Sequence, residues 1–148
     1  MSFTQAIKSC WSKYATFSGR APRSEYWFFQ LFIFLCIMAL GVLALIFGAL
    51  GSAVGGDQQA NAAGAGAGIG IGLVGLLGIL FLFAVIVPQL AVSVRRIHDT
   101  GASGWLVLLY FIPYLGGLIA IVWGCIPGTP GPNAYGPSPF ETPADTFN

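Results

Sequence analysis

Three long apolar stretches, separated by short polar segments, dominate the pattern of the chain. No charged residue occurs at positions 26–50, 69–94 or 104–126. At a rise of 1.5 Å per residue, a helix over the first stretch is about 37 Å long, and one over the third is about 34 Å long. A hydrocarbon core is only about 30 Å thick. The pattern therefore predicts an all-α integral membrane protein with three membrane-spanning helices.

Prolines interrupt two of these stretches. Pro88 lies inside the second stretch and removes one backbone hydrogen bond, so we expect a kink there. Pro113 lies near the middle of the third stretch, and two glycines follow it closely. We predict a single kinked span over the whole third stretch. A re-entrant hairpin that turns at residues 113–117 is the alternative, because each half would be too short to cross.

Before the first span, residues 2–17 show a helical repeat of apolar side chains. Five residues recur at intervals of four, four, three and three positions: Phe3, Ile7, Trp11, Tyr14 and Phe17. This spacing predicts an amphipathic helix that lies in the membrane interface, with its aromatic rings among the headgroups and its lysines toward anionic lipid. A short soluble helix that packs on the rest of the chain is the alternative.

Glycine is concentrated between the first two spans and at the start of the second. Residues 51–68 are rich in Gly and Ala, which predicts a flexible connector. A phosphate-binding glycine loop sits between a strand and a helix, and a P-loop also needs a following Lys; neither context occurs here. Gly64, Gly68 and Gly72 are instead spaced by four, and Gly75 continues that face. We expect this face to let two lipid-embedded helices approach closely.

The composition indicates lipid as the solvent of this chain and narrows its partners. Of the 148 residues, 56% are hydrophobic and 7% are charged, and the mean hydropathy is +0.81. A soluble domain carries about 25% charged residues. The net charge of +1 gives no basic patch large enough for nucleic acid. The cysteines Cys10, Cys36 and Cys125 have neither metal-ligand spacing nor the pattern of a disulfide framework, so we expect no metal and no cofactor.

The distribution of Lys and Arg predicts the orientation in the membrane. The segment before the first span has four of these residues, the loop after it has none, residues 95–103 have two, and the tail has none. This alternation predicts a multi-pass protein with its N-terminus in the cytoplasm and its tail outside. The hairpin alternative would return the tail to the cytoplasm.

This topology brings two polar motifs to the cytoplasmic face. They comprise Arg20, Arg23 and Glu25 in the first, and Arg95, Arg96, His98 and Asp99 in the second. Asp99 lies four residues after Arg95 and three after Arg96, so local ion pairs are expected if the helix continues that far. Glu25 can pair with an arginine of the second motif and so lock the first span to the rest.

Three interpretations of these motifs are open. In the first, the residues are topology signals and interface ion pairs. In the second, the arginines bind an anion or a lipid headgroup, because a guanidinium presents a planar fork of donors that suits phosphate. In the third, His98 and Asp99 carry out proton chemistry for transport or catalysis. Adjacent side chains on a helix do not face each other, and the three stretches hold no acid or histidine, so we assign no catalytic residue.

Three motifs carry a resemblance to a known family. Residues 17–27 (FSGRAPRSEYW), 95–105 (RRIHDTGASGW) and 127–137 (PGTPGPNAYGP) resemble the family of domain of unknown function 805, the YhaH-like proteins of the bacterial inner membrane. The resemblance runs from about Tyr14 to Pro139. It implies a small multi-span protein of the bacterial inner (plasma) membrane with no assigned activity. The family pattern directs attention to Arg20, Arg23, Glu25, Tyr26, Arg95, Arg96, His98, Asp99, Gly101, Trp105, Asn133, Tyr135 and Gly136.

The chain departs from the family pattern in two places. The loop over residues 51–68 is longer than in the shorter members, and Ala134 stands where a basic residue is common. The second departure weakens any anion-binding role of the tail. If Asn133 to Gly136 works together with the two arginine motifs, the tail must be cytoplasmic, against the charge count.

We therefore expect three parts. They are an interfacial helix with the first cytoplasmic motif (1–25), a membrane domain (26–126) with spans at about 26–50, 69–94 and 104–126, and an extended, poorly packed Pro/Gly-rich tail (127–148). The leading hypothesis is a non-enzymatic protein that binds a partner protein or lipid headgroups through its cytoplasmic Arg, Glu, His and Asp residues. Its expected partners are membrane lipids and another membrane protein or a second copy of itself, not nucleic acid. A small transporter or channel subunit is the alternative, because helices with internal prolines can bend.

Overall fold

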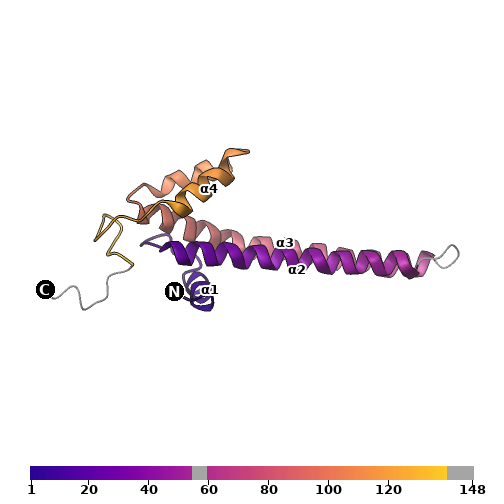
Figure 1. Ribbon diagram of the computed structural model, residues 1–148. Coiled ribbons are helices and arrows are strands. Elements are labelled where there is room, and N and C mark those ends of the chain that lie inside the picture. The colour runs from indigo at the N-terminus through magenta and orange to yellow at the C-terminus, as the bar shows by residue number, and fades with distance from the viewer. Residues whose placement is uncertain (55–59, 140–148) are drawn as a thin grey trace. The chain divides into compact units, whose positions relative to one another are not determined.

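The computed structural model describes residues 1–54 and 60–139 and is almost entirely helical (Figure 1). Its elements are α1 (Phe3–Ser12), α2 (Arg23–Val54), α3 (Ala60–Asp99), the 3-10 helix η1 (Gly104–Phe111) and α4 (Leu115–Cys125). Within the described residues there is no strand, only an isolated bridge between Asn133 and Gly136. The predicted all-α class is confirmed.

The chain forms two compact units, to which α2 and α3 both contribute. The first unit contains residues 1–31 and the chain from residue 86 onward, and the second contains residues 32–85. All six Lys and Arg residues of the sequence belong to the first unit. The second unit is built from the apolar parts of the two long helices.

In the described part of the chain, two helices are long and apolar enough to cross a membrane. They cover Arg23–Gly51 and Gly66–Asp99, with mean hydropathies of 2.9 and 2.8 over their most apolar windows. Only 0% and 17% of those windows are buried inside the molecule, so their large apolar side chains face outward. A core helix of a soluble protein would bury such residues, whereas a helix in lipid exposes them. The first two expected spans fall inside these helices.

The connector expected over residues 51–68 is largely helical instead. α2 continues to Val54 and α3 begins at Ala60, so only residues 55–59 of that connector lie outside the described residues. The Gly/Ala composition was interpreted as flexibility, but alanine is the strongest helix former and offsets the cost of the glycines between. Both long helices therefore extend beyond the predicted spans.

The second unit packs α2 against α3 through a glycine that the spacing argument did not select. Gly70 lies so close to Phe47 that a Cβ on it would be 2.4 Å from the ring. Gly68, Gly72 and Gly75 instead have nothing within 4 Å of a Cβ position, so the predicted glycine face is wrong for these three. Gly64, the fourth residue of that face, lies outside the residues whose side chains the structure describes. Phe32 of α2 and Phe81 of α3 also contact each other, with their ring centroids 6.4 Å apart.

The third apolar stretch does not form the single kinked span that we predicted. η1 ends at Phe111, α4 begins at Leu115, and the backbone reverses at Tyr114, which has a φ of 67°. Gly116 is needed at this turn, since a Cβ there would lie 1.9 Å from the carbonyl oxygen of Tyr110. Pro113 thus marks a turn between two helices rather than a bend within one.

The two halves of this hairpin are short and pack on each other. Eight 3-10 residues rise about 16 Å at about 2.0 Å each, and eleven α-helical residues rise about 16 Å at 1.5 Å each. Each half is therefore about half of a hydrocarbon core. Figure 1 shows α4 lying beside η1. The chain therefore follows the path of the hairpin that was the alternative for this stretch, and its re-entry into the membrane stays a prediction.

The N-terminal helix α1 is real but shorter than the apolar repeat suggested. It starts with a capping box, in which the Ser2 hydroxyl accepts from the Gln5 backbone and the Gln5 side chain accepts from the Ser2 backbone. Ala6 and Cys10 are buried, and the Phe3 ring makes an edge contact with an α2 ring at 6.0 Å. α1 therefore packs on the first unit, as the alternative interpretation expected. Its location in the membrane interface stays a prediction.

Candidate functional site

The two predicted polar motifs converge where α2 begins and α3 ends. A backbone hydrogen bond from Ala21 to the carbonyl of Arg95 joins the two segments at 3.1 Å. The charged side chains were expected to form an accessible cytoplasmic face, but most of them are buried instead. The buried members are Arg20, Glu25, Arg95, Arg96 and Asp99, the most exposed at 8%. They form an ion-pair network inside the first unit.

Glu25 is the first of the two carboxylates in this network. It lies in the first turn of α2, where a negative charge suits the positive end of the helix dipole. Its Oε1 accepts from Arg95 Nη1 at 3.0 Å and from the Ser9 hydroxyl at 3.0 Å. The Cys10 thiol also donates to Oε1, at 3.7 Å. Burial, together with the charge of Glu25, raises the pKa of the Cys10 thiol to about 12, so that thiol stays protonated near neutral pH.

Asp99 is the second carboxylate and joins two arginines. Arg20 Nε donates to Oδ1 at 2.8 Å, and Arg96 Nη1 donates to Oδ2. Arg96 precedes Asp99 by three residues on α3, which is the helical spacing that the sequence predicted. Gly128 packs against the same carboxylate, since a Cβ on it would lie 2.1 Å from Oδ2. Asp99 thus links the two motifs. A side chain at position 128 would displace its carboxylate.

Backbone carbonyls satisfy the remaining donors of two arginines. Arg20 Nη1 and Nη2 donate to the carbonyls of Gly131 and Thr129, both at 2.6 Å. Arg96 Nε donates to the carbonyl of Trp123 at 3.1 Å, and its Nη2 donates to that of Ile126. These bonds hold the end of α4 and the chain that follows it against the end of α3. The end of α4 therefore lies beside the ion pairs. The start of η1 is also near them, because η1 begins five residues after α3 ends.

Residues 127–139, which we call the tail strap, are packed rather than extended and free. Thr129 donates from its backbone to the carbonyl of Asp99 at 2.8 Å. Asn133 Nδ2 donates to the carbonyl of His98 at 2.9 Å, and the Tyr135 ring stacks on the His98 ring at 3.8 Å. The prediction of a poorly packed tail is therefore wrong for these residues. Positions 140–148 lie outside the described residues.

The strap completes the C-terminus of α3. Gly101 follows the helix with a φ of 80°, the left-handed conformation that commonly ends a helix, and its N–H donates to the carbonyl of His98. The Asn133 side chain donates to the same carbonyl oxygen of His98. The strap and Gly101 thus cap backbone groups that would otherwise be unpaired. These contacts give Gly101, Asn133 and Tyr135 structural roles, and they use the carbonyl and the ring face of His98.

Three further predicted residues, Tyr26, Arg23 and Trp105, take no part in the ion pairs. Tyr26 is buried, and its hydroxyl donates to the carbonyl of Ala120 at 3.1 Å. Arg23 is exposed and donates to the carbonyl of Ile126 at 3.2 Å. Trp105 is 79% exposed and takes no part in the ion pairs.

Sequence reasoning missed several contributors to the site. Ser9 was not singled out and Cys10 was considered only as a metal ligand or disulfide partner, although both reach Glu25. The carbonyls of Thr129 and Gly131 have no signal in their side chains. The glycine-rich strap motif was the only available hint.

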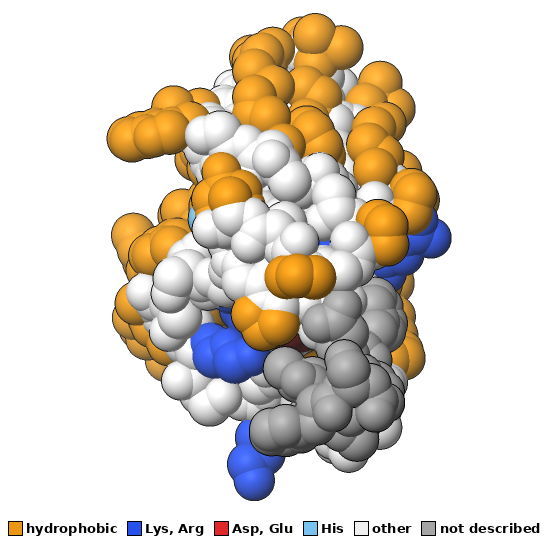
Figure 2. All heavy atoms as spheres, turned by 90° about the vertical axis from the view of Figure 1, so that its left-hand side faces the viewer, with side chains coloured by type: hydrophobic (Ala, Val, Ile, Leu, Met, Phe, Trp, Pro, Cys, Tyr) orange, Lys and Arg blue, Asp and Glu red, His pale blue; other side chains and the backbone are white. Residues whose placement is uncertain are grey.

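A polar cavity of about 490 Å³ lies next to the network. The charged side chains that line it are Lys13, Arg20, Glu25 and Arg95, and Tyr135 and Gly136 of the strap close another wall. In Figure 2, blue Lys and Arg side chains come to the surface of this end of the molecule, whereas the red of Asp and Glu is almost hidden. Of the three basic side chains that line the cavity, Arg20 and Arg95 are buried and Lys13 is exposed.

No group of three or more potential metal-ligating side chains occurs in the part of the chain that the structure describes. The chemistry offered by the cavity is that of guanidinium and ammonium donors around one carboxylate that is already paired. Such a lining can hold an anion.

Long apolar helices with exposed apolar side chains, tied at their charged ends by buried ion pairs, define a small helical membrane protein. Comparison with known families makes the assignment specific. The family model described as "Protein of unknown function (DUF805)" matches residues 14–137, so the chain belongs to this family.

Curated relatives agree with that assignment. The "Inner membrane protein YhaH" of Escherichia coli (strain K12) is 40% identical over 130 residues, which cover 88% of this chain and 92% of the relative. The "Inner membrane protein YhaI" of the same organism is 36% identical over 126 residues, which cover 85% and 87%. No solved structure matches the chain. The resemblance inferred from the three sequence motifs is confirmed.

Proposed function

We propose that this protein binds the phosphate-bearing headgroup of an anionic membrane lipid in its polar cavity. The lipid is held by basic side chains at the cytoplasmic border of the membrane, and no chemical reaction follows. This is the lipid-headgroup form of the expected function, in which guanidinium groups recognise phosphate.

The charge balance of the buried network supports an anion as the ligand. Among the residues that the structure describes, three guanidinium groups lie buried with two carboxylates, which leaves one positive charge in excess there. An uncompensated charge away from water is costly, and carbonyl dipoles offset it only in part. Lys13 on the cavity wall adds a further positive charge. An anion in the cavity would neutralise the excess.

The single observation that carries the proposal is an unused donor of Arg95. Its Nη1 is paired with Glu25, and its Nε reaches the carbonyl of Ala91 at 3.4 Å. Its Nη2 is buried and has no hydrogen-bond partner among the described residues. Arg95 also lines the polar cavity. A buried donor without a partner costs roughly 1–3 kcal/mol, and more for a charged group, so a phosphate oxygen would remove a real penalty.

The proposal includes a topology in which this cavity lies at the cytoplasmic border. We infer that α2 and α3 cross the membrane and that η1 and α4 enter and leave on one side. All six Lys and Arg residues then lie on that side, and the positive-inside rule assigns it to the cytoplasm. The N-terminal segment and the tail strap share it. The anionic cytoplasmic leaflet would therefore supply the headgroup.

Transport has no comparable support. The cavity between the long helices in the second unit has a volume of about 310 Å³ and is lined by apolar side chains and two glycines. A polar pathway would usually display polar or ionisable groups at this depth.

Lipid binding can be tested with a matched pair of lysine variants. Lys13 lines the cavity and Lys8, also exposed, does not. The purified full chain, in nanodiscs of neutral lipid, is titrated with phosphatidic acid and separately with free glycerol phosphate. We expect Lys13→Gln to weaken phosphatidic acid binding about fivefold, the effect of roughly one basic charge near a lipid surface, and Lys8→Gln to have little effect.

A second variant, Arg95→Lys, distinguishes the effect of charge from that of the guanidinium geometry. The comparison of phosphatidic acid with glycerol phosphate distinguishes a lipid from a soluble phosphate ligand. Arg95→Lys keeps a cation opposite Glu25 but loses the planar fork, so binding should weaken while the fold is retained. Binding of glycerol phosphate alone would identify a soluble phosphate ligand and overturn the lipid proposal. Equal effects of Lys8→Gln and Lys13→Gln would show nonspecific attraction and would also overturn it.

A further inference from the structure

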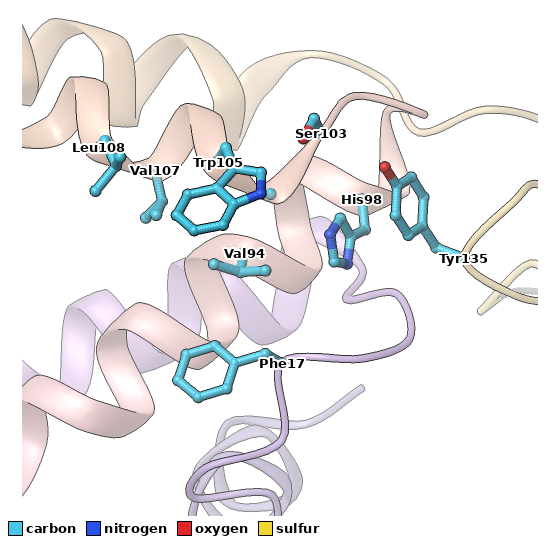
Figure 3. Close-up of a pocket in the computed structure, with 9 residues that line it drawn as sticks. Phe17, Val94, His98, Ser103, Trp105, Val107, Leu108 and Tyr135 are labelled. Carbon is cyan, nitrogen blue, oxygen red and sulfur yellow. The ribbon is translucent and has the colours of Figure 1, made fainter.

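A second cavity, larger and mostly apolar, lies in the same unit (Figure 3). Its volume is about 540 Å³, within the range of roughly 300–1,000 Å³ that is typical of ligand pockets. Apolar side chains from the linker, α3 and η1 form most of its wall: Phe17, Val94, Trp105, Val107 and Leu108. His98, Ser103, Gly104 and Tyr135 complete it. The buried ion pairs do not use this cavity.

The shape of the apolar cavity depends on the rings around it. Figure 3 shows the Trp105 indole on one side and Phe17 on the opposite side, with Val94 between them. Gly104 lets η1 approach α3 closely, since a Cβ there would lie 2.7 Å from His98 Nε2 and 2.8 Å from Val94 Cγ1. Trp105 is 79% exposed at the rim, as expected for a tryptophan at a membrane border.

One side chain separates the two cavities. Tyr135 lines both the polar cavity and the apolar cavity, and its ring lies nearly parallel to that of His98, at 5°. The polar cavity contains the basic groups and the apolar cavity contains almost none. The two therefore form adjacent compartments with opposite chemistry.

From this arrangement we infer that a single amphiphile occupies both cavities, with its phosphate in the polar cavity and one acyl chain in the apolar cavity. The inference rests on the proposed function, which supplies the phosphate site. An acyl chain is the occupant that fits, because the cavity adjoins the headgroup site at Tyr135 and belongs to a protein surrounded by lipid. A soluble polar ligand would leave the apolar wall uncovered.

The inference predicts that affinity depends on chain length. Each methylene that enters an apolar site from water strengthens binding about fourfold. Glycerol phosphate and 1-acylglycerol phosphates with six to twelve carbons form a suitable series, and the neutral 1-acylglycerols are matched probes without phosphate. Binding to the full chain in amphipol is measured by calorimetry. We expect affinity to rise with chain length for the phosphates and to be weak throughout for the neutral series.

A filling variant tests whether the chain lies in this cavity. Leu108 lines it and is exposed, whereas Leu118 on α4 is equally exposed and does not line it. Leu108→Trp should remove most of the chain-length dependence and leave glycerol phosphate affinity unchanged, while Leu118→Trp should bind the whole series as the wild type does. Equal chain-length dependence in both variants would overturn the inference. So would a dimer that is lost only in Leu108→Trp, since a second copy would then occupy the groove.

The two proposals fail in different ways. If phosphates bind according to Lys13 but without any effect of chain length, the headgroup site stands and the shared amphiphile is wrong. If the neutral and phosphate series bind equally, and Lys13→Gln changes neither, the headgroup proposal itself is wrong.

Discussion

At the residue scale, two carboxylates each serve more than one donor. Asp99 receives Arg20 and Arg96, and Glu25 receives Arg95 and the Ser9 hydroxyl. Bonds between charged groups are stronger than neutral ones, but the loss of hydration largely offsets them in a buried site. The network therefore fixes the geometry of the segment ends more than it adds net stability. The network affects the free energy of unfolding strongly only when one partner of an ion pair is removed.

Asp99→Asn should be strongly destabilising. The substitution keeps the shape of the side chain but leaves Arg20 and Arg96 buried without a counter-charge, which costs about 3–5 kcal/mol. Denaturant unfolding in a mild detergent measures the free energy of unfolding directly. Arg23→Gln is the control, because Arg23 is exposed and makes one carbonyl contact, so its effect should stay within about 0.5 kcal/mol. Similar unfolding midpoints for both variants would contradict a structural role for the ion pairs.

The sequence predicted which charged side chains meet but not where they lie. Spacing alone indicates that Asp99 can reach Arg96 one turn away, and the position of Glu25 in a first turn indicates a fixed carboxylate. Burial depends instead on what covers them. The covering groups are carbonyls of Thr129 and Gly131, which lie 109 and 111 positions after Arg20 in the sequence. Backbone acceptors leave no trace in side-chain chemistry, so this part of the site had to be observed.

At the element scale, hydropathy predicted the long helices and failed at the third stretch. Both halves of residues 104–126 are as apolar as a true span, so composition does not distinguish one crossing from a hairpin. The distinction comes from Tyr114, which adopts a positive φ, and from Gly116, which allows the turn to close. Pro113 is compatible with either outcome.

The glycine error has a related cause. Small residues at intervals of four define a face of a helix, but they do not specify which face meets a neighbour. In the second unit that choice is made by the Phe47 ring, which needs the space at Gly70. A regular pattern was therefore less informative than one bulky partner.

Gly70→Leu should destabilise the packing of α2 on α3. Its side chain would overlap the Phe47 ring, and overpacking of this kind typically costs about 1–3 kcal/mol. Gly72→Leu is the matched control, since nothing lies within 4 Å of a Cβ at that position. Thermal unfolding in detergent compares the two, and Phe47→Ala should partly rescue Gly70→Leu but not improve the control. Equal stability of both leucine variants would show that the packing of α2 on α3 does not depend on the space at Gly70.

At the scale of the whole molecule, the hydrogen bonds within the first unit constrain the path of the chain. The tail strap binds Asp99 and Arg20, and the end of α4 binds Arg96. A tail on the far side of the membrane would be separated from these groups by a hydrocarbon core of about 30 Å. The charge count predicted a tail outside, because the tail carries no Lys or Arg and the third stretch was expected to cross the membrane. The contacts therefore favour a tail on the same side of the membrane as the N-terminal segment.

We accordingly expect a reporter fused after Pro139 to be cytoplasmic. A green fluorescent protein there should fluoresce, and alkaline phosphatase at the same position should be inactive, because one folds only inside the cell and the other only outside. A phosphatase fusion after Val54, at the end of α2, should be active and serves as the control for one complete crossing. The reverse result at Pro139 would establish a third full span. It would also separate Thr129 from Asp99 by the thickness of the membrane, so neither the ion-pair network nor the polar cavity formed with the tail strap would exist in the inserted protein.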